Sequence, residues 1–347
     1  HRNQRGSWLD RGRPDGDPTR KSPLRDRLRL RLGGRHGRGD QGHADRRLVH
    51  VRRRHPLGAA RSHDLRADRL SGPLDPADRS RLEELLARHR FKPVHRLGQN
   101  FLVDPGLADA VAEAVGADAD DEVLEVGAGP GVLTVRLAAR AGRVIAVELD
   151  RRLVAILREV TTGLANVEIS AADVLKMPLP PVPIVAGNIP YYLTGALLPK
   201  LLERPDPPRR VSLVVQKEVA QRWTRPGDWS LATLAVHLFA VPRLELELPR
   251  DAFWPAPEVD SALVVMDVRS RPAVPVDDLP GLLRVAERIF QFRRKQLGAT
   301  LTRIAGPGAA ERLKSVGIDP ARRPQTLSLE EWSSLYRAFS GSGGKTA

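Results

Sequence analysis

The feature that most constrains the fold is a glycine-rich turn that joins a short apolar run to a helical pattern. Residues 122–126 form the apolar run, residues 127–131 read Gly-Ala-Gly-Pro-Gly, and a helix is expected at about 132–141. Glycines allow a sharp turn and a close approach of the backbone to a ligand. Dinucleotide-binding enzymes use similar turns, so this one predicts a strand–turn–helix unit and leaves its ligand open. A turn that binds no ligand is the simplest alternative.

Apolar runs alternate with helical patterns along most of the chain. Helices are expected near 105–115 and 151–160, and strands at 143–147, 166–170, 183–186, 211–216, 244–248 and 262–268. This alternation is typical of a mostly parallel sheet that helices cover on both faces. The sequence therefore predicts an α/β fold with a Rossmann-like sheet, which we place in a domain at residues 78–270.

The pattern becomes helical after about residue 270. Helices are expected at 280–292, 294–304, 309–316 and 330–339, with glycines and prolines between them. We expect a small helical RNA-binding domain at 271–340 and a flexible tail at 341–347.

The amino-terminal segment differs from the rest of the chain. Residues 1–75 contain 20 arginines and lysines against nine aspartates, which places +11 of the formal charge of +14 there. Trp8 is the only aromatic residue of this segment, so it cannot bury enough apolar surface to offset its ordering entropy. We expect residues 1–77 to be a disordered, Arg-rich extension. It is either a basic arm that contacts RNA phosphates or, as we favour, an extension translated from upstream of the true start.

The composition excludes several classes of protein. The chain has no cysteine, which excludes a disulfide framework and a zinc–cysteine site, and we expect no metal. No apolar run approaches the ~18 residues that a membrane helix needs, and the beginning of the sequence lacks the apolar core of a signal peptide. We therefore expect a cytoplasmic protein that contacts no membrane, and nothing suggests more than a monomer.

Two carboxylates follow successive strands. Glu148 closes the second strand and Asp173 follows the third, at the sheet edge where ligands of open α/β proteins bind. A carboxylate at Glu148 suits the ribose hydroxyls of an adenosine, and one at Asp173 suits an adenine amino group. With Gly127 and Gly129 in the turn, these residues predict a nucleoside-containing cofactor. Both NAD and S-adenosylmethionine fit Glu148, but the turn lacks the GxGxxG spacing of dinucleotide sites.

The motif Asn188-Ile189-Pro190-Tyr191 closes the fourth strand. The lone pair of an adenine N6 is delocalised into the ring, so N6 is a poor nucleophile. The side-chain oxygen of Asn188 and the backbone carbonyl of Ile189 can accept both N6 hydrogens and localise that lone pair. Pro190 fixes the turn, Tyr191 offers a ring for an extruded base, and Phe253 can stack on its other face. A strand-to-loop turn and a packing loop are the alternatives.

Together these motifs resemble the ribosomal RNA adenine N6,N6-dimethyltransferases over about residues 90–340. The resemblance rests on Gly98-Gln-Asn-Phe-Leu102, Glu125-Val-Gly-Ala-Gly-Pro-Gly131, Asn188-Ile-Pro-Tyr191, Val215-Gln-Lys-Glu-Val219 and Phe253-Trp-Pro-Ala-Pro-Glu-Val-Asp-Ser261. Of the two branches of this family, the chain looks like the kasugamycin-resistance type, which acts on small-subunit (16S) RNA. The segments 290–297 and 317–327 resemble that branch. The first 75 residues have no counterpart, and Gly227-Asp-Trp229 replaces a Tyr-Gly pair that members often carry.

The resemblance implies the cofactor S-adenosyl-L-methionine and a set of site residues. The cofactor contacts fall on Asn100, Leu102, Gly127, Glu148, Asp173 and Asn188. The target adenine is expected between Tyr191 and Phe253, and Arg293, Arg294 and Lys295 are expected to contact RNA phosphates. Substrates of the family are two adjacent adenosines in a hairpin near the 3′ end of small-subunit RNA, within a partly assembled subunit. Each receives two methyl groups during ribosome biogenesis.

Three other interpretations stay open. The chain could be a large-subunit (23S) RNA methyltransferase of the macrolide-resistance type, which shares the motifs. It could be a catalytically silent assembly factor on the same fold, although an intact Asn188 argues against this. A nicotinamide dehydrogenase is the alternative at the level of the fold, and the sequence lacks its typical motif.

Overall fold

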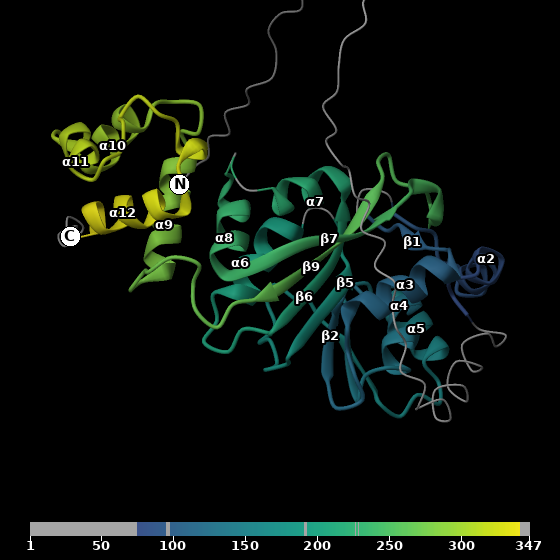
Figure 1. Cartoon of the computed structure of the whole chain (residues 1–347). Helices are drawn as coiled ribbons and strands as arrows, with labels where there is room; N and C mark the ends of the chain where they lie inside the picture. Colours follow the sequence, from purple (N-terminus) through teal and green to yellow (C-terminus); the bar gives the residue numbers. More distant parts are fainter. Residues whose placement is uncertain (1–74, 95–97, 191–192, 226, 228, 341–347) are drawn as a thin grey trace, which may run out of the picture. The chain divides into compact units, whose positions relative to one another are not determined.

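The computed structural model describes residues 75–94, 98–190, 193–225, 227 and 229–340. Its centre is a seven-stranded sheet of order β4-β3-β2-β5-β6-β9-β7 (Figure 1). The strands are β2 (Glu122–Val126), β3 (Arg143–Glu148), β4 (Val167–Ala171), β5 (Ile184–Asn188), β6 (Arg210–Gln216), β7 (Ala240–Leu248) and β9 (Ser261–Val268). The first five are mutually parallel, and β9 pairs antiparallel with both β6 and β7. The predicted α/β fold is therefore confirmed.

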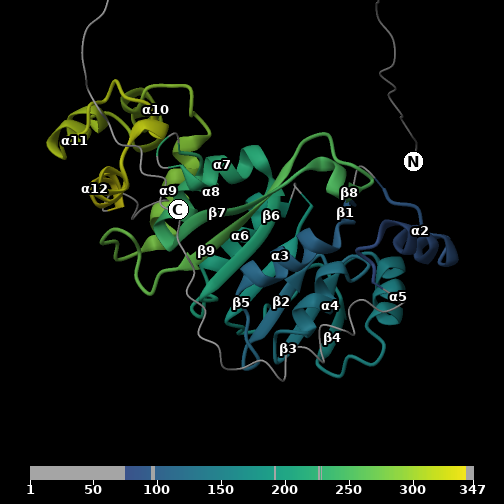
Figure 2. The ribbon, with the colours of Figure 1, turned by 45° about the vertical axis from the view of Figure 1, so that its right-hand side comes forward.

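Helices cover both faces of the sheet, as the sequence predicts. The helices α3 (Pro105–Val115), α4 (Val132–Ala138) and α5 (Arg151–Val160) lie together on one face (Figure 2). The other face carries α6 (Thr194–Leu202), α7 (Lys217–Thr224) and α8 (Leu231–Phe239), which the sequence analysis did not predict. Proline and aspartate signals locate the start of α3, where the Asp104 carboxylate caps Leu107 N–H and Pro105 opens the helix.

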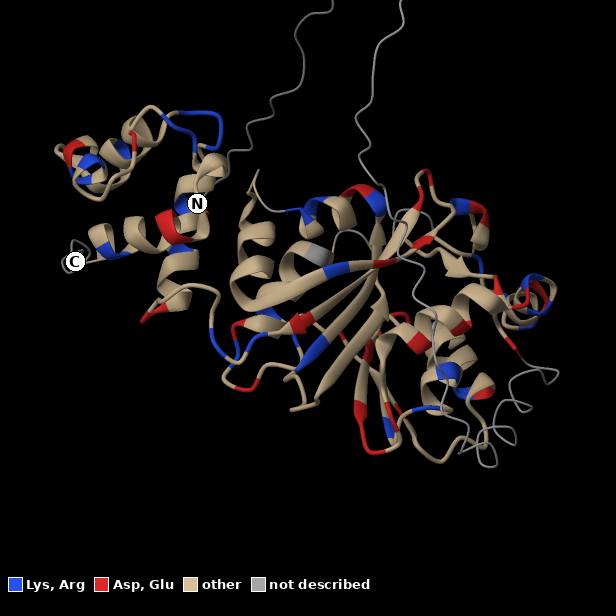
Figure 3. Cartoon of the chain, in the orientation of Figure 1, with Lys and Arg blue, Asp and Glu red and all other residues tan. Residues whose placement is uncertain are grey.

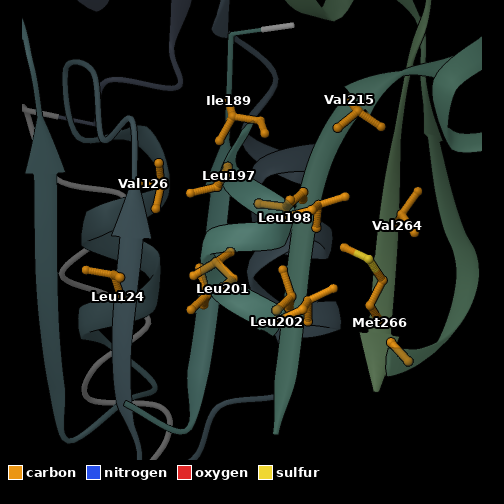
Figure 4. Packing of buried hydrophobic residues seen from close by; sticks show 14 of the residues in the cluster. Leu124, Val126, Ile189, Leu197, Leu198, Leu201, Leu202, Val215, Val264 and Met266 are labelled. Atoms are coloured by element: carbon orange, nitrogen blue, oxygen red, sulfur yellow. The ribbon is translucent and has the colours of Figure 1, made fainter. Parts of the chain in front are cut away.

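Alternation along the strands divides the core between these two faces. In β2, Val123 packs with α3 and α4, whereas Leu124 and Val126 face the opposite side. Four fully buried leucines of α6, at positions 197, 198, 201 and 202, pack against that opposite side (Figure 4). The carboxyl-terminal part of α6, from Leu197 to Leu202, is therefore held to the sheet.

The strand β7 is longer than the expected 244–248 because it begins at Ala240. Its early part contains Pro242, which lacks the N–H that a central strand must donate. The strand tolerates proline because β7 lies at the edge of the sheet and pairs only with β9. A second, two-stranded ladder was not predicted: β1 (Phe101–Leu102) pairs antiparallel with β8 (Phe253–Trp254).

The carboxyl-terminal segment contains α9 (Leu279–Phe290), α10 (Leu297–Ala305), α11 (Ala309–Ser315) and α12 (Leu329–Ser340). Their common core centres on Trp332, Leu282 and Leu335 and includes Leu234 and Leu238 of α8. Within the residues that the structure describes, no helix combines the length and apolar character needed to cross a bilayer.

Trp229, which belongs to the stretch expected in place of a Tyr-Gly pair, has a structural role. Trp229 is buried, its indole N–H donates to Leu327 O, and its backbone N–H donates to Gln325 O at 3.2 Å. Its ring meets His237 edge-on, at 5.1 Å between ring centroids. This tryptophan therefore joins the segment before α8 to the segment before α12.

The described part of the chain begins at Asp75, which binds a buried arginine. Arg136 of α4 is 1% exposed, and its guanidinium pairs with Asp75 at 2.9 Å and with Asp109 at 2.7 Å. Ala77 is fully buried in the core beneath α3 and α4. Residues 75–77, which we assigned to the extension, are thus packed. The predictions for residues 1–74 and 341–347 lie outside the described residues.

Replacement of Arg136 by leucine should lower the free energy of unfolding by about 3 kcal/mol, because it leaves Asp75 without its buried partner. Urea unfolding followed by circular dichroism measures this change. The matched control is Arg143→Leu, since Arg143 pairs with Glu122 and Glu168 at an exposed position and should matter much less. Equal losses in the two variants would contradict the proposed importance of the buried pair.

A second buried charge lies in β2. Glu125 is 1% exposed, and its Oε2 atom has no hydrogen-bond partner among the described residues. Burial raises the pKa of Glu125 to about 8; the charge of Glu148 adds to the rise, and the nearby Thr134 hydroxyl opposes it. The carboxyl is therefore protonated in the folded protein at neutral pH.

Glu125 should make stability depend on pH. Between the unfolded pKa of 4.5 and the folded value of about 8, the folded state keeps a proton that the unfolded state has lost. The free energy of unfolding therefore falls as pH rises through this window, by up to about 1.4 kcal/mol per pH unit. Glu125→Gln removes this dependence. The free energy of unfolding of the variant, measured with urea, should therefore rise relative to that of the parent from pH 5 to pH 8. Parallel pH curves for the two proteins would refute the assignment.

Candidate active site at the carboxyl ends of the strands

A cavity of about 350 Å³ opens where the parallel strands end. Its size lies in the range of small-molecule sites, and most of its lining is apolar. The structure brings most of the predicted site residues to this cavity: Asn100, Leu102, Gly127, Gly129, Glu148, Asp173, Asn188, Pro190 and Phe253 all line it. Residues from separate sequence motifs therefore lie along one concave surface, and their roles stay predictions.

The glycine-rich turn forms one wall of the cavity. Gly127, Gly129 and Gly131 all have positive φ angles, of 72°, 57° and 94°, a region that favours glycine. A Cβ atom at Gly129 would lie 3.4 Å from the ring of Phe101, and one at Gly127 would lie 3.5 Å from Asn188 O. The N–H groups of Gly127 and Ala128 both donate to Val147 O of the neighbouring strand. The turn is therefore fixed against the end of β3.

Glu148 is held at the end of β3 by backbone donors. Its Oε2 accepts from Gly129 N–H at 2.9 Å, and its Oε1 accepts from Asp150 N–H at 2.8 Å. Burial raises the pKa of Glu148, while the N–H groups of Asp150, Gly129 and Leu149 oppose the rise. Both carboxylate oxygens are oriented, and each keeps a lone pair for a further donor.

Asp173 lies in the loop after β4 and is 27% exposed. Its Oδ1 accepts from Leu175 N–H at 3.0 Å, within the turn that this loop forms. Its Oδ2 lies 3.4 Å from the exposed ammonium of Lys176. The carboxylate thus borders the cavity with one oxygen fixed by the loop and the other 3.4 Å from the exposed ammonium of Lys176.

Asn188 ties the end of β5 to the loop at 98–102. Its Nδ2 donates to Asn100 O at 3.1 Å. A carbonyl can only accept, which fixes the orientation of the amide and leaves Oδ1 as the acceptor for a bound group. The side-chain Oδ1 of Asn100 is itself buried, with no partner among the described residues. A polar ligand in the cavity would supply its missing donor.

The residues expected to bind the target base differ in their position relative to the cavity. Phe253 is 4% exposed and lines the cavity, placed there by the β1–β8 ladder in which it pairs with Leu102. The side chain of Ile189 is buried in the core beneath α6 and does not line the cavity, so only its backbone carbonyl could serve a ligand. Tyr191 lies outside the described residues.

The three basic residues expected to contact RNA are not part of the cavity. Arg293, Arg294 and Lys295 form a continuous basic stretch in the turn between α9 and α10 (Figure 3). Arg294 and Lys295 are exposed, and the N–H of Lys295 donates to Phe292 O at 2.8 Å. Their expected role is therefore separate from the cofactor site.

Several lining residues were not predicted as site residues, among them Gln99, Glu125 and Leu149. Gln99 bridges the 98–102 loop to α5, because its Oε1 accepts from Val94 N–H at 2.7 Å and its Nε2 donates to Asp150 at 3.3 Å. Leu149 lines the cavity although it is 60% exposed, and Glu125 lines it from within the glycine motif. Gln99 and Glu125 belong to the motifs at 98–102 and 125–131. Their place in these motifs was the signal that could have predicted them as lining residues.

Comparison with known proteins connects this site to a family. Residues 90–340 match the family model described as ribosomal RNA adenine dimethylase. The chain is 40% identical to ribosomal RNA small subunit methyltransferase A of Pelotomaculum thermopropionicum over 286 residues, which cover 76% of this chain and 97% of the relative. It is 37% identical to the protein of the same name from Geobacillus thermodenitrificans, again over 76% and 97% of the two chains.

Two solved structures also resemble this chain. The 23S rRNA methyltransferase ErmE matches with a TM-score of 0.56 and 31% identity, over 70% of this chain and all of that one. A dimethyladenosine transferase from Plasmodium falciparum matches with a TM-score of 0.62 and 24% identity, over 70% and 98% of the two chains, and this likeness concerns the fold. The chain belongs to the ribosomal RNA adenine dimethylase family.

Proposed function

We propose that this protein transfers methyl groups from S-adenosylmethionine to N6 of two adjacent adenosines near the 3′ end of small-subunit (16S) rRNA, which gives N6,N6-dimethyladenosine. The observation that carries the proposal is the single cavity that joins Glu148, Asp173, Asn188 and Phe253. The relatives named small subunit methyltransferase A, which match along almost their whole length, support the choice of RNA.

The residues of the cavity fit S-adenosylmethionine better than a dinucleotide. Carboxyl groups of Glu125, Glu148, Asp150 and Asp173 line it, and no lysine or arginine is among its described lining residues. Because Glu125 is protonated at neutral pH, the repulsion of a pyrophosphate would come from the carboxylates of Glu148, Asp150 and Asp173, which match a ligand with sulfonium and ammonium groups. When bound, this cofactor supplies an electrophilic methyl group. Glu148 would hold its ribose hydroxyls, Asp173 its adenine amino group, and the unpartnered Asn100 oxygen a further donor.

The chain's own groups then act on the target adenine. Asn188 Oδ1 and the carbonyl of Ile189 accept the two N6 hydrogens, which concentrates the nitrogen lone pair on N6. Phe253 offers an apolar ring face to an extruded base, and Tyr191 offers the opposite face. The fixed amide of Asn188 would align N6 within the mostly apolar lining, so catalysis would depend on orientation and need no strong base.

We further propose that the substrate is a partly assembled small subunit, which the protein binds as a cytoplasmic monomer. The basic turn between α9 and α10 would contact RNA phosphates, and residues 271–340 would act as the RNA-binding domain. The likeness to the 23S rRNA methyltransferase ErmE makes the large subunit the second candidate substrate.

Methyl transfer to purified ribosomal subunits tests the proposal. Undermethylated small subunits should accept radiolabelled methyl groups as N6,N6-dimethyladenosine, large subunits should not, and Asn188→Ala should lower the rate at least about 100-fold through loss of alignment. Label in the large subunit alone would assign the protein to the other branch. A protein that binds S-adenosylmethionine and labels neither subunit would be a silent assembly factor.

The basic turn should contribute to binding and not to the methylation step. The double variant Arg294→Ala/Lys295→Ala should weaken binding to small subunits by about tenfold at low salt and reduce the salt dependence of binding. The rate at saturating subunit concentration should change little. Filter binding at several salt concentrations measures the effect, with Lys314→Ala on α11 as a control for loss of charge. Unchanged affinity would show that the phosphate contacts lie elsewhere.

A further inference from the structure

The loop after β4 shapes the part of the cavity that contains Asp173. Residues 172–175 of this loop line the cavity. Its turn is closed by the Asp173 carbonyl, which accepts from the N–H groups of Lys176 and Met177, each at 2.9 Å. The Asp173 side chain accepts from Leu175 N–H in the same turn. The position of this carboxylate therefore depends on the position of the whole turn.

The turn is held from outside by one lysine. Lys200 of α6 donates from its Nζ atom to Leu175 O and to Met177 O, both at 2.7 Å. The two carbonyls belong to the turn that carries Asp173, and hydrogen bonds from an ammonium are stronger than neutral ones. Lys200 is half-buried and does not line the cavity. It therefore acts on the cavity through the loop and not through contact with a ligand.

A second cation on α6 makes similar bonds farther along the loop. Arg204 donates to Pro180 O at 2.9 Å and to Leu179 O at 3.2 Å. Neither of these carbonyl-bearing residues lines the cavity. Lys200 and Arg204 can therefore be compared directly. Both bind the loop through its carbonyls, but of the two only Lys200 binds a carbonyl of a residue that lines the cavity, Leu175.

The helix that carries Lys200 is a rigid support. Its buried leucines pack on the sheet (Figure 4), and Leu193 just before it donates its N–H to Pro190 O at 2.9 Å. The helix begins six residues after Asn188, at Thr194. The same rigid element therefore follows the motif proposed for the target base and fixes the loop proposed for the cofactor's adenine.

We propose that Lys200 is a positioning residue for cofactor recognition: through the carbonyls of Leu175 and Met177 it fixes Asp173, and so sets the selectivity of the site for an adenine nucleoside. This inference rests on the proposed contact between Asp173 and the adenine amino group. Without the ammonium, the two carbonyls lose their common partner and the turn can shift. A carboxylate misplaced by about 1 Å loses a hydrogen bond to the amino group.

The test compares two ligands that differ at the group Asp173 would bind. S-adenosylhomocysteine carries the adenine amino group, and S-inosylhomocysteine carries an oxygen in its place, which a carboxylate repels. Isothermal titration calorimetry on the full chain gives both affinities. The parent protein should prefer the adenine ligand by about 100-fold, and Lys200→Met should reduce this ratio to below about tenfold. A fraction of unfolded protein would lower both affinities alike and leave the ratio unchanged.

Matched variants separate positioning from general loop anchoring. Lys200→Arg keeps charged donors and should retain the ratio within about threefold. Arg204→Met removes two equivalent bonds from the same helix and should also retain it. In an Asp173→Ala background, Lys200→Met should have no further effect on the ratio, because the group it positions is gone. An unchanged ratio in Lys200→Met, or equal losses from Lys200→Met and Arg204→Met, overturns the inference.

The variant Asp173→Ala distinguishes failure of the inference from failure of the proposed site. If Asp173→Ala lowers the ratio and Lys200→Met does not, Asp173 recognises adenine without help from Lys200, and only the inference fails. If Asp173→Ala leaves the ratio at the parent's value, the proposed adenine contact is wrong, and the inference fails with it.

Discussion

Parallel pairing of β2, β3, β4 and β5 is the constraint on which the candidate site depends. It brings the carboxyl ends of these strands to one edge, so that groups far apart in the sequence meet in one cavity. The backbone strengthens this arrangement, because the glycine turn donates to Val147 O and Glu148 accepts from Gly129. Two loops form the remaining walls. Asn188 binds the loop at 98–102 to the end of β5, and Lys200 binds the loop after β4 to α6.

Much of this organisation could be predicted from the sequence, because it depends on local signals. The apolar runs, the glycine turn and the cap at Asp104 act over a few residues, and the structure contains the corresponding elements. Features that depend on distant contacts could not be predicted. The ladder between Leu102 and Phe253 joins residues about 150 positions apart, and the burial of Arg136 follows from Asp75 and Asp109, whose positions only the fold determines. The roles of individual site residues remain predictions.

The cavity combines several carboxyl groups with a mostly apolar lining. Carboxyl groups gather in a largely apolar space, and the cations that contact the loop after β4, which are Lys176, Lys200 and Arg204, do not line the cavity. Burial raises the pKa of both Glu125 and Glu148, so bringing a positive charge into the cavity would favour their ionised forms. The lining therefore favours a positively charged ligand, as the proposed cofactor S-adenosylmethionine is at its sulfonium group.

The short ladder between β1 and β8 has a kinetic consequence. It joins the loop that borders the cofactor side of the cavity to the aromatic residue on the base side, and Asn188 fastens the same loop to the sheet. Two methyl groups on each of two adenosines consume four donor molecules, so the spent donor must leave three times before the RNA is finished. Because the ladder joins the two walls, a movement of this loop would also move the base-side wall. If the spent donor leaves past this loop, its departure would disturb the base-side wall, so donor exchange would compete with retention of the RNA.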